Sequence, residues 1–361
     1  MDQVKIAIDD GHDTMKVCFG FDEANNEYQC VSVKSLAIRG MQQIASLNKE
    51  APVYAADGET FTMVPDNALG RHLDTRFIEY PKSALNRVLV HHALVESGMG
   101  GRAVNVVTGL PVDQYYKGGK KNIELINAKI ANISKPVNVI TKNISLANIV
   151  ENRVMSEAIA AVFDIVFNGD GSENIETFEL ISRRPIAVVD MGGKTLDIAT
   201  IMENIDGIYY DRSGTENIGV LRLKEEVASK LKNNFTLNNE PPSKYVEEAI
   251  RTKQYEVFGE LHDISELIES VCREYVVAIQ NAMLKRIGDG SDLGAVVFVG
   301  GGAALLQSVF GSAIFSEIYQ GRCIIPNHPQ FSNAIGMWKY ATFVAVESVK
   351  STHEAEAATV D

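Results

Sequence analysis

The most restrictive feature of this sequence is a glycine turn that directly follows an acidic residue between two strand-like segments. Residues 187–200 run Ala-Val-Val-Asp-Met-Gly-Gly-Lys-Thr-Leu-Asp-Ile-Ala-Thr, so an apolar run ends at Asp190 and an alternating pattern resumes after Gly193. The pattern predicts a strand, a tight turn and a returning strand. Glycine allows the turn to adopt positive φ and to present backbone N–H groups to an anion.

A P-loop is the first alternative, because Gly193-Lys194-Thr195 matches the end of that motif. A P-loop also needs a glycine five residues before Gly193, and position 188 is a valine. It needs a helix after the threonine, whereas the strand-like alternation continues here. The sequence therefore excludes a P-loop on both counts.

The same hairpin pattern occurs a second time near the N-terminus. Residues 6–19 run Ile-Ala-Ile-Asp-Asp-Gly-His-Asp-Thr-Met-Lys-Val-Cys-Phe, which places Asp9 on Asp190 and Gly11 on Gly192. The offset is 181 residues (190 − 9), half of the 361-residue chain. A match at half the chain length predicts two related halves, each with an acidic glycine hairpin.

Two carboxylates at glycine turns point to a cation as well as an anion. An aspartate aimed at a phosphate would repel it, so Asp9 and Asp190 imply a divalent cation between them and a nucleotide. Mg²⁺ fits, since it retains its waters and is held by a few carboxylates and substrate phosphates. The alternative is an ordinary hairpin with a polar turn. It explains one hairpin equally well, but the matched pair favours the nucleotide site.

At these residues the chain resembles the actin-like ATPases, the superfamily of actin, Hsp70 chaperones and sugar kinases. Asp9-x-Gly11 with Lys16 resembles the first phosphate motif of this superfamily. The second phosphate motif is resembled by Asp190-x-Gly192-Gly193-x-Thr195-x-Asp197. More narrowly, the chain resembles the bacterial plasmid-segregation actins of the ParM/StbA family. That likeness rests on Ile8–Gly11, Val90–Leu94, Gly109–Pro111 with Tyr115-Tyr116, Met155–Glu157, and Val299–Ala303, the last resembling the adenosine motif.

The resemblance implies an α/β actin-like ATPase fold, in which two related α/β domains flank a nucleotide cleft. The length agrees, because a single hydrophobic core stops growing at about 250–300 residues. The expected division is domain I over 1–184, with a small outer subdomain at about 36–100, and domain II over 185–332. Residues 333–350 would complete domain I, and 351–361 would form an acidic flexible tail.

The resemblance also implies the site residues. Glu157 would orient or deprotonate the attacking water with the help of Asp190, although a carboxylate in the first turn of a helix is by itself more often solvated and favoured by the helix dipole. Asp9 and Asp190 would hold Mg²⁺ through water. The nucleotide-binding set would comprise Asp9, Asp10, Gly11, His12, Asp13, Thr14, Lys16, Gly192, Gly193, Lys194, Thr195, Gly300, Gly301, Gly302 and Ala303.

Three of these positions depart from the usual pattern of the superfamily. His12 and Asp13 stand where small hydroxyl residues or glycine are usual, and Lys194 stands where a neutral residue is usual. His12 has two interpretations, a donor to a phosphate oxygen or a cap for the turn. Lys194 likewise faces either the phosphates or solvent.

The function implied is that of a filament-forming bacterial actin, which hydrolyses ATP to ADP and phosphate and segregates plasmid DNA. Subunits would assemble head-to-tail, and a ParR-like adaptor would bind DNA at the filament end. The net charge of −13 agrees with indirect DNA contact, because direct binding to phosphates needs a basic stripe. The alternatives are a sugar- or acetate-type kinase and an Hsp70-like ATPase module. The first lacks a visible substrate-pocket carboxylate, and the second lacks a peptide-binding domain after the ATPase part.

The composition predicts a cytoplasmic protein without a membrane partner. No apolar run approaches the ~18 residues of a membrane span. The four cysteines are scattered and form no C-x-x-C pair, which favours free thiols. The adjacent histidines His91 and His92 face different sides of a predicted helix, so structural roles are favoured over a metal site.

Hydrophobic periodicity predicts the main elements along the chain. Strands are expected at 4–10, 14–20 and 27–35, and residues 36–81, which are irregular in sequence, are assigned to the small outer subdomain of the first half. A close helix crossing is expected at Gly336, in the last predicted helix. Further helices are expected at 86–98, 114–130, 264–287 and after Ser156 or Asn152.

Overall fold

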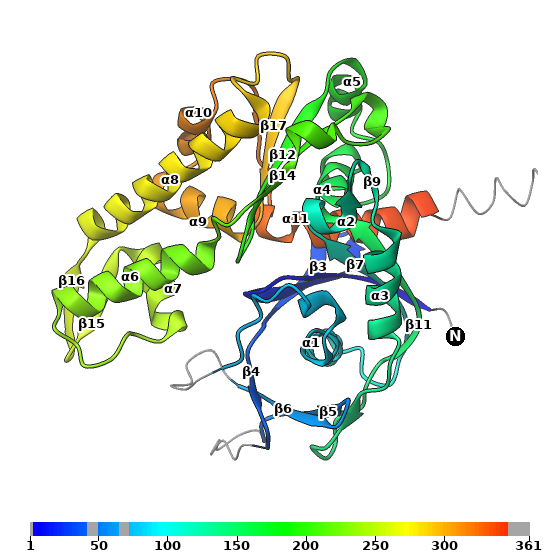
Figure 1. Ribbon diagram of the computed structural model, residues 1–361, viewed down its shortest axis with the longest axis vertical. Helices are drawn as coiled ribbons and strands as arrows, with labels where there is room; N and C mark the ends of the chain where they lie inside the picture. The colour runs from blue at the N-terminus through cyan, green and yellow to red at the C-terminus, as the bar shows by residue number, and fades with distance from the viewer. Residues whose placement is uncertain (1–2, 42–49, 65–71, 346–361) are drawn as a thin grey trace, which may run out of the picture.

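The computed structural model describes residues 3–41, 50–64 and 72–345, so the predicted acidic tail lies outside the described residues. Its first half is built on a five-stranded sheet with the order β11-β7-β1-β2-β3 (Figure 1). The three strands predicted near the N-terminus are confirmed. The strands are β1 (Val4–Asp10), β2 (Thr14–Asp22), β3 (Glu27–Lys34), β7 (Ala103–Leu110) and β11 (Asn148–Ser156).

The second half repeats this arrangement in a sheet of order β14-β13-β12-β17-β18. In each sheet an antiparallel hairpin (β1–β2 or β12–β13) is followed by a parallel strand beside its first member (β7 or β17). The prediction of two related halves is therefore confirmed at the level of topology. The strands are β12 (Ile186–Met191), β13 (Leu196–Ile201), β14 (Gly214–Glu216), β17 (Ala295–Val299) and β18 (Cys323–Ile324).

The second sheet has helices on both faces, which explains why β12 is apolar throughout. Ala187 and Val189 pack with α6, α8 and α9, whereas Ile186 and Val188 pack with α4 and α5 on the opposite face. A sheet covered on both faces needs a continuous apolar run rather than alternation. The helices are α4 (Glu157–Val166), α5 (Ile175–Arg183), α6 (Val220–Asn234), α7 (Ser243–Thr252), α8 (Ser265–Ile287), α9 (Gly301–Phe310) and α10 (Ala313–Ile318).

Residues 36–81 are irregular in sequence, yet their described part forms short strands that the sequence did not predict. β4 (Ala37–Arg39), β5 (Val53–Ala56) and β6 (Glu59–Met63) form an outer sheet with β10 (Asn138–Val139). The turn between β5 and β6 is Asp57-Gly58, with φ of 52° and 80°. Asp-Gly between short strands is a hairpin signal, and the brevity of the strands hid their alternation.

Helix α1 (Ala84–Glu96) lies between this outer sheet and the first five-stranded sheet, so it is buried on nearly all sides (Figure 1). Within it, the Nδ1 atom of His92 lies 3.1 Å from the hydroxyl of Tyr54. Burial lowers the pKa of His91 to about 4. Both histidines therefore belong to the packed interior, and among the described residues no cluster of metal-ligating side chains includes them.

The helix predicted over 114–130 is wrong in its first part. The chain forms a short helix α2 (Val112–Tyr115), a two-residue-strand hairpin and then α3 (Ile123–Ile133). The hairpin joins β8 (Tyr116–Lys117) to β9 (Lys120–Lys121) through two glycines at φ 59° and 75°. Consecutive residues in the left-handed region end a helix, and the two glycines make that conformation accessible.

The helix predicted at 264–287 is confirmed as α8, whereas α7 and the hairpin before α8 were not predicted. That hairpin joins β15 (Gln254–Val257) to β16 (Glu260–Asp263).

All four cysteines carry free thiols, as predicted. Across the described ranges, no helix combines the length and hydrophobicity that a membrane crossing needs.

The two halves are joined between their main sheets by the crossing of α4 with α11 (Ser332–Lys339), because α4 packs on the second sheet and α11 on the first (Figure 1). A β-carbon built on Gly336 would lie 1.7 Å from the carbonyl oxygen of Ala160, so the two backbones touch. Lys339 secures the crossing, because its Nζ lies 2.9 Å from the Asp164 carboxylate and both side chains are buried. The close crossing predicted at Gly336 is thus confirmed.

Replacing Gly336 with alanine is expected to destabilise the protein by about 1–3 kcal/mol or more, because the added methyl group forces the helices apart. Chemical denaturation measures this loss. Gly207→Ala is the matched control, since the nearest atom to its added β-carbon is the Met202 sulfur at 3.7 Å. Equal stability of the two variants would contradict the tight crossing.

Candidate functional site

The two acidic turns meet in the structure. A β-carbon built on Gly193, in the second turn, would lie 3.0 Å from the β-carbon of Asp13 and 3.2 Å from its backbone nitrogen, in the first turn. Turns that are 180 residues apart in the chain are therefore in contact across the gap between the halves. The spatial arrangement that the internal repeat predicts is present.

The aspartates that end β1 and β12 occupy equivalent registers with different partners. Asp9 pairs across its hairpin with Lys16, whose Nζ lies 2.7 Å from the carboxylate. Asp190 pairs across its own hairpin with a second acid, Asp197, and accepts a 2.7 Å hydrogen bond from the Asn333 side chain. The first hairpin is therefore locally neutral, and the second carries uncompensated negative charge.

Glu157 adds a further carboxylate at the first position of α4. Its side chain keeps some contact with solvent, yet burial and the neighbouring Asp9 and Asp190 raise its pKa well above the usual range. Burial and then Asp9 raise the pKa of Asp190, and burial raises that of Asp197 to about 7. Crowded carboxylates with raised pKa values mark a place where a cation would be stabilised.

This donor set fits Mg²⁺ held partly through water. Over the described part of the chain, no three acidic, histidine or cysteine side chains converge as direct metal ligands. Mg²⁺ commonly binds through one or two carboxylates and completes its shell with water and phosphate oxygens. Asp9 and Asp190 supply two such carboxylates, and the negative charge around Glu157 favours the cation.

The carbonyl oxygens of the first turn are already engaged by the protein. Ser35 donates its hydroxyl to the carbonyl of Gly11 at 2.8 Å and its N–H to that of Asp13 at 3.0 Å. The Thr75 hydroxyl donates to the carbonyl of His12 at 2.7 Å. With these carbonyls satisfied, the N–H groups are the polar backbone atoms that the turn can offer to a ligand.

The carbonyl oxygens of the second turn are also engaged by the protein, in this case by the N-terminus of α6. Val220 and Leu221 donate their N–H groups to the carbonyls of Gly192 and Gly193 at 3.0 and 2.9 Å. Gly219 permits this approach, because a β-carbon there would lie 2.2 Å from the Gly193 oxygen. Both turns are thus fixed with their carbonyls turned toward protein, which suits them to bind an anion.

A pocket of about 460 Å³ opens beside the turns and is lined by α6, α7 and α9 of the second half. This volume suits a small-molecule ligand. Apolar side chains from all three helices form part of its wall, namely Val220, Ile250 and Leu305. Of the predicted site residues, those that line it are Gly11, His12, Asp13, Thr14, Lys16, Gly193 and Gly301.

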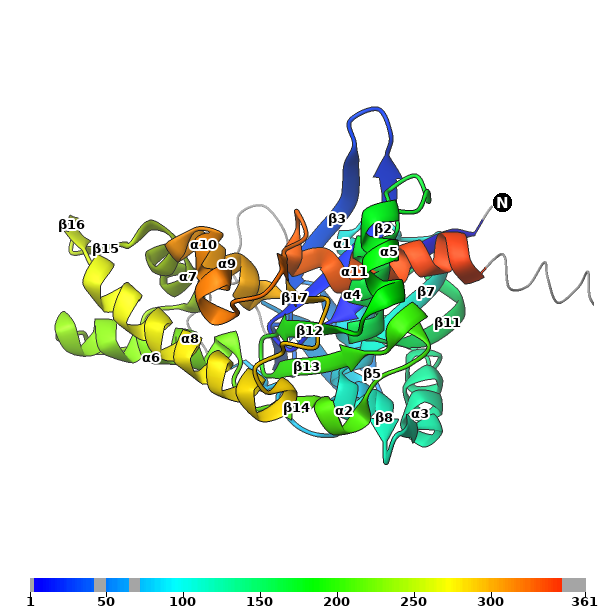
Figure 2. The same cartoon turned by 90° about the horizontal axis from the view of Figure 1, so that it is seen from above.

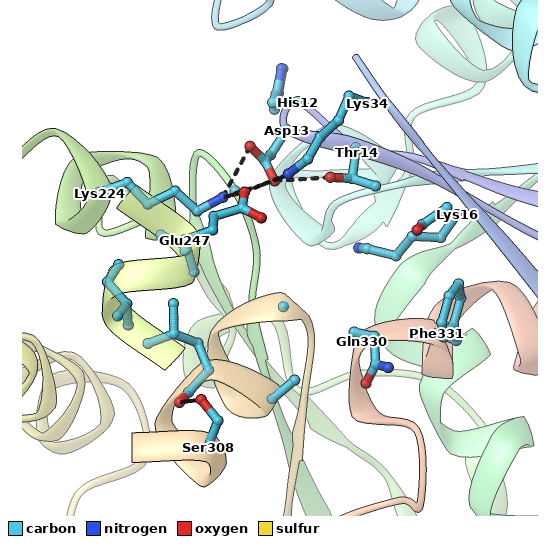
Figure 3. Close-up of a pocket in the computed structure, with 18 of the residues that line it drawn as sticks. His12, Asp13, Thr14, Lys16, Lys34, Lys224, Glu247, Ser308, Gln330 and Phe331 are labelled. Atoms are coloured by element: carbon cyan, nitrogen blue, oxygen red, sulfur yellow. Dashed lines mark hydrogen bonds and ion pairs between the residues drawn. The ribbon is translucent and has the colours of Figure 1, made fainter. Parts of the chain in front are cut away.

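Four charged side chains close over one side of this pocket (Figure 3). We name them the cross-cleft cluster: Asp13 and Lys34 from the first half, and Lys224 and Glu247 from the second. Lys224 lies 3.1 Å from Asp13 and 2.5 Å from Glu247, and Lys34 also contacts both acids. Although burial opposes it, the two lysines lower the pKa of both carboxyl groups.

The cluster changes the interpretation of Asp13. The sequence predicted that Asp13 binds nucleotide, and in the structure its carboxylate pairs with two lysines and accepts a 2.9 Å hydrogen bond from Thr14. Its backbone remains part of the turn. The side chain of Asp13 therefore links the two halves, and its nucleotide contact stays a prediction.

His12 has its ring on Tyr80, with the ring centroids 4.8 Å apart, and points away from the cross-cleft cluster (Figure 3). Burial and the nearby Lys194 lower its pKa to about 4, so the ring is neutral at pH 7. The packing of this neutral ring against Tyr80 agrees better with a cap for the turn than with a charged donor to a phosphate oxygen. Lys194 is half-buried at the second turn.

Asp10 is directed into the first half. Its carboxylate forms an ion pair with Lys129 at 2.8 Å and accepts a 2.6 Å hydrogen bond from the Asn86 side chain. All three side chains are buried. The Asp10 carboxylate thus has two partners within the first half, and nucleotide binding by Asp10 stays a prediction. The burial of Lys129 on α3 was not predicted, because its partner Asp10 lies 119 positions away in the chain.

The glycines after β17 mainly allow close packing against the acidic strand. β-Carbons on Gly300 and Gly302 would lie 2.4 Å from the Asp190 carboxylate and 2.6 Å from the Met191 side chain. Ala303 is fully buried. Gly301 alone of the four lines the pocket, with no atom within 4 Å of its added β-carbon. Gly301 is therefore the one of these four residues placed to lie against a ligand in the pocket, and the predicted nucleotide contacts of all four stay predictions.

Several residues of the site were not predicted: Lys34, Lys129, Lys224, Glu247 and Asn333. For Glu247 a signal was available, because Val246, Ala249 and Ile250 recur at helical spacing after Pro242 and indicate α7. The others are single polar residues in elements whose faces the sequence does not fix. Only the fold brings them to the site.

Comparison with known proteins identifies the relatives of this fold. The crystal structure of the actin-like protein Alp7A superposes with a TM-score of 0.72 at 15% identity, covering 99% of this chain and 100% of that one. Ta0583, an archaeal actin homologue also solved with ADP, gives 0.70 at 20% identity, with 94% and 99% covered. A 15-stranded ParM filament from Clostridium botulinum gives 0.68 at 17% identity, with 94% and 99% covered.

Family models cover nearly the whole chain, whereas a search of curated proteins gave no significant match. Residues 4–168 match the N-terminal model of the plasmid segregation protein ParM, and residues 182–340 match its C-terminal model. The resemblance inferred from the two hairpins is confirmed by both models and by the shared fold. The chain belongs to the ParM family of actin-like plasmid segregation proteins.

Proposed function

We propose that this protein binds Mg·ATP between its halves, hydrolyses it to ADP and phosphate, and couples the reaction to filament growth and disassembly. The observation that carries the proposal is the contact between the two acidic turns, with Asp9 and Asp190 behind them. The family match favours this function over the kinase and Hsp70-like alternatives. The domain division 1–184 with 333–350, and 185–332, forms part of the same proposal.

Backbone N–H groups at Gly11 and Gly193 would hold the phosphates, and Lys16 would offer its ammonium to them. The N–H of Gly192 donates to the Thr195 carbonyl at 2.9 Å, so Gly192 would support the turn against which the phosphates lie. Burial opposes the charge of Lys16, yet Asp9 and Asp190 raise its pKa, so it stays protonated. Mg²⁺ would supply charge neutralisation and a template for the phosphate oxygens. Phosphoryl transfer depends mainly on such positioning and electrostatic stabilisation.

Glu157 would orient the attacking water and accept its proton. A largely desolvated carboxylate with a raised pKa is suited to act as a general base. A cation near Asp9 and Asp190 offsets the charges that raise the pKa of Glu157, so the carboxylate form becomes accessible once substrate is bound. Asp190 assists from the opposite hairpin, held in place by Asn333.

Lys129 would act as a positioning residue for this carboxylate. Its Nζ donates to the Asp10 carboxylate and to the carbonyl of Gly109. Gly109 in turn lies against Glu157, because a β-carbon on it would lie 2.6 Å from the Glu157 Cγ. One buried ammonium thereby joins the end of β1 to the strand that supports Glu157.

Filament formation follows from family membership and agrees with the assembled Clostridium botulinum ParM. We infer that subunits join head-to-tail when nucleotide closes the cleft, since a heterologous contact produces an open polymer. A ParR-like adaptor would make the contact with plasmid DNA. The net charge of −13 supports delegating DNA binding to such a partner in the cytoplasm.

Glu157→Ala is expected to lower the rate of ATP hydrolysis roughly 10²–10⁴-fold while nucleotide affinity stays near normal, because only proton transfer and water orientation are lost. Phosphate release under saturating ATP and fluorescent-nucleotide titration give the two values. Glu151→Ala is the control, since Glu151 is exposed and pairs with Arg153. Unchanged turnover in Glu157→Ala would remove this residue from the reaction.

Lys129→Met is expected to lower the unfolding free energy by about 3–5 kcal/mol, because Asp10 is left buried without its cation. The double variant Asp10→Asn with Lys129→Met should recover most of that loss, while its hydrolysis rate stays reduced. Chemical denaturation and single-turnover hydrolysis measure the two effects. Full turnover in the stable double variant would show that Lys129 serves stability alone.

Lys224→Met is expected to speed the release of ADP about three- to tenfold, because it removes one of two cations that join the halves across the pocket. Stopped-flow displacement of a fluorescent ADP measures the rate. Lys232→Met, in the last turn of the same helix, is the control. Release at the wild-type rate would mean that the cross-cleft cluster does not limit opening.

A further inference from the structure

The β15–β16 hairpin carries the most exposed large apolar side chain described in the protein. Phe258 at its tip is 96% exposed, and Leu261 on β16 is 63% exposed. Four cross-strand pairs, from Gln254 with Asp263 to Val257 with Glu260, make the hairpin a regular ladder. The tip therefore projects on an ordered support, at the far edge of the second half (Figures 1 and 2).

Phe258 is also an unfavourable residue for its own turn. Phe258 and Gly259 have φ of 51° and 84°, the two positive values of a type I′ turn. Such turns favour Asn, Asp or Gly at the first position, and the Asp57-Gly58 turn of this chain follows that preference. A bulky aromatic residue in the left-handed region is strained, and here it also exposes its whole ring. Neither cost is offset by a contact within the described chain.

The hairpin is acidic around this ring. Glu256 and Glu260 flank the tip, and both are exposed. Neither forms an ion pair with any residue that the structure describes. The hairpin thus presents an exposed aromatic ring between two negative charges that are unpaired within the described residues. A surface that binds it would carry basic side chains around an apolar centre.

A surface of that kind lies on the β8–β9 hairpin. Lys117, Lys120 and Lys121 are exposed, and within the described ranges none of them has an ion-pair partner. Ile123, at the start of α3 beside them, is 56% exposed. Together these four residues form a basic patch around an exposed aliphatic side chain, which we name the lysine hairpin surface.

The two surfaces cannot meet within one molecule. The β15–β16 hairpin lies at the left edge in both perpendicular views, whereas β8 and β9 lie on the right (Figures 1 and 2). Two different, complementary patches on opposite sides of one chain join copies in a non-closing series. A second copy of this chain is therefore the partner that fits both surfaces at once.

We propose that the Phe258 hairpin of one copy docks onto the lysine hairpin surface of the next and forms a subunit contact of the filament. The proposal rests on the assembly included in the proposed function and assigns residues to it. Burial of the ring and pairing of Glu256 and Glu260 with lysines give the contact both affinity and orientation. Direct pairing of unlike charges also makes the contact sensitive to salt.

The test compares ATP-dependent assembly of full-length variants by high-speed pelleting and light scattering. Phe258→Asn removes the ring and suits the turn, so the fold is retained. It should raise the critical concentration about tenfold or more. Fluorescent-nucleotide affinity should not change. Leu284→Ser is the matched control, since Leu284 is 64% exposed on α8 of the same half.

Charge reversal tests the pairing of the two surfaces. Two charge-reversal variants should each block assembly: Glu256→Lys with Glu260→Lys, and Lys117→Glu with Lys120→Glu and Lys121→Glu. A mixture of the two variants should restore contact between unlike copies.

If the wild type assembles and Phe258→Asn assembles equally well, this contact alone is overturned. Failure of the wild type to assemble with ATP would overturn the assembly function as well. Normal assembly of Phe258→Asn with loss of binding to another protein would assign the Phe258 ring to that partner instead.

Discussion

The contact between two acidic glycine turns is the constraint on which the rest of the structure depends. It brings Asp9, Asp190, Asp197 and Glu157 close together, and burial with mutual repulsion raises the pKa of the last three. Lys16 compensates only part of this charge. A cation near these carboxylates would offset their mutual repulsion, which supports the ligand proposed for the site.

Two buried lysines hold the elements that carry these charges. Lys339 fastens the crossing of α4 and α11 beneath the cleft, and Lys129 joins the ends of β1 and β7 behind the first turn. Each ammonium donates to backbone carbonyls as well as to a carboxylate, so it fixes main-chain positions and not only a side chain. The cross-cleft cluster lies beside the pocket, and all its members except the buried Lys224 are half-buried, which would allow it to break if the halves separate.

The sequence predicted those parts of the structure that depend on local patterns of residues. The repeated hairpin predicted two related halves, and Gly336 in the last predicted helix marked the close helix crossing. The outer sheet was missed because its strands are only three to five residues long. The lysine partners of Asp10 and Asp13 were missed because their pairing depends on residues 21 to 211 positions away, which no local pattern records.

The most direct test of the central claim is a crystal structure with Mn²⁺ in place of Mg²⁺ and a slowly hydrolysed ATP analogue. The account predicts an anomalous Mn²⁺ peak between the carboxylates of Asp9 and Asp190, with the phosphates against the Gly11 and Gly193 turns. It further predicts the base and ribose in the pocket beside α7 and α9. Nucleotide bound elsewhere, or a metal peak remote from both aspartates, would contradict it.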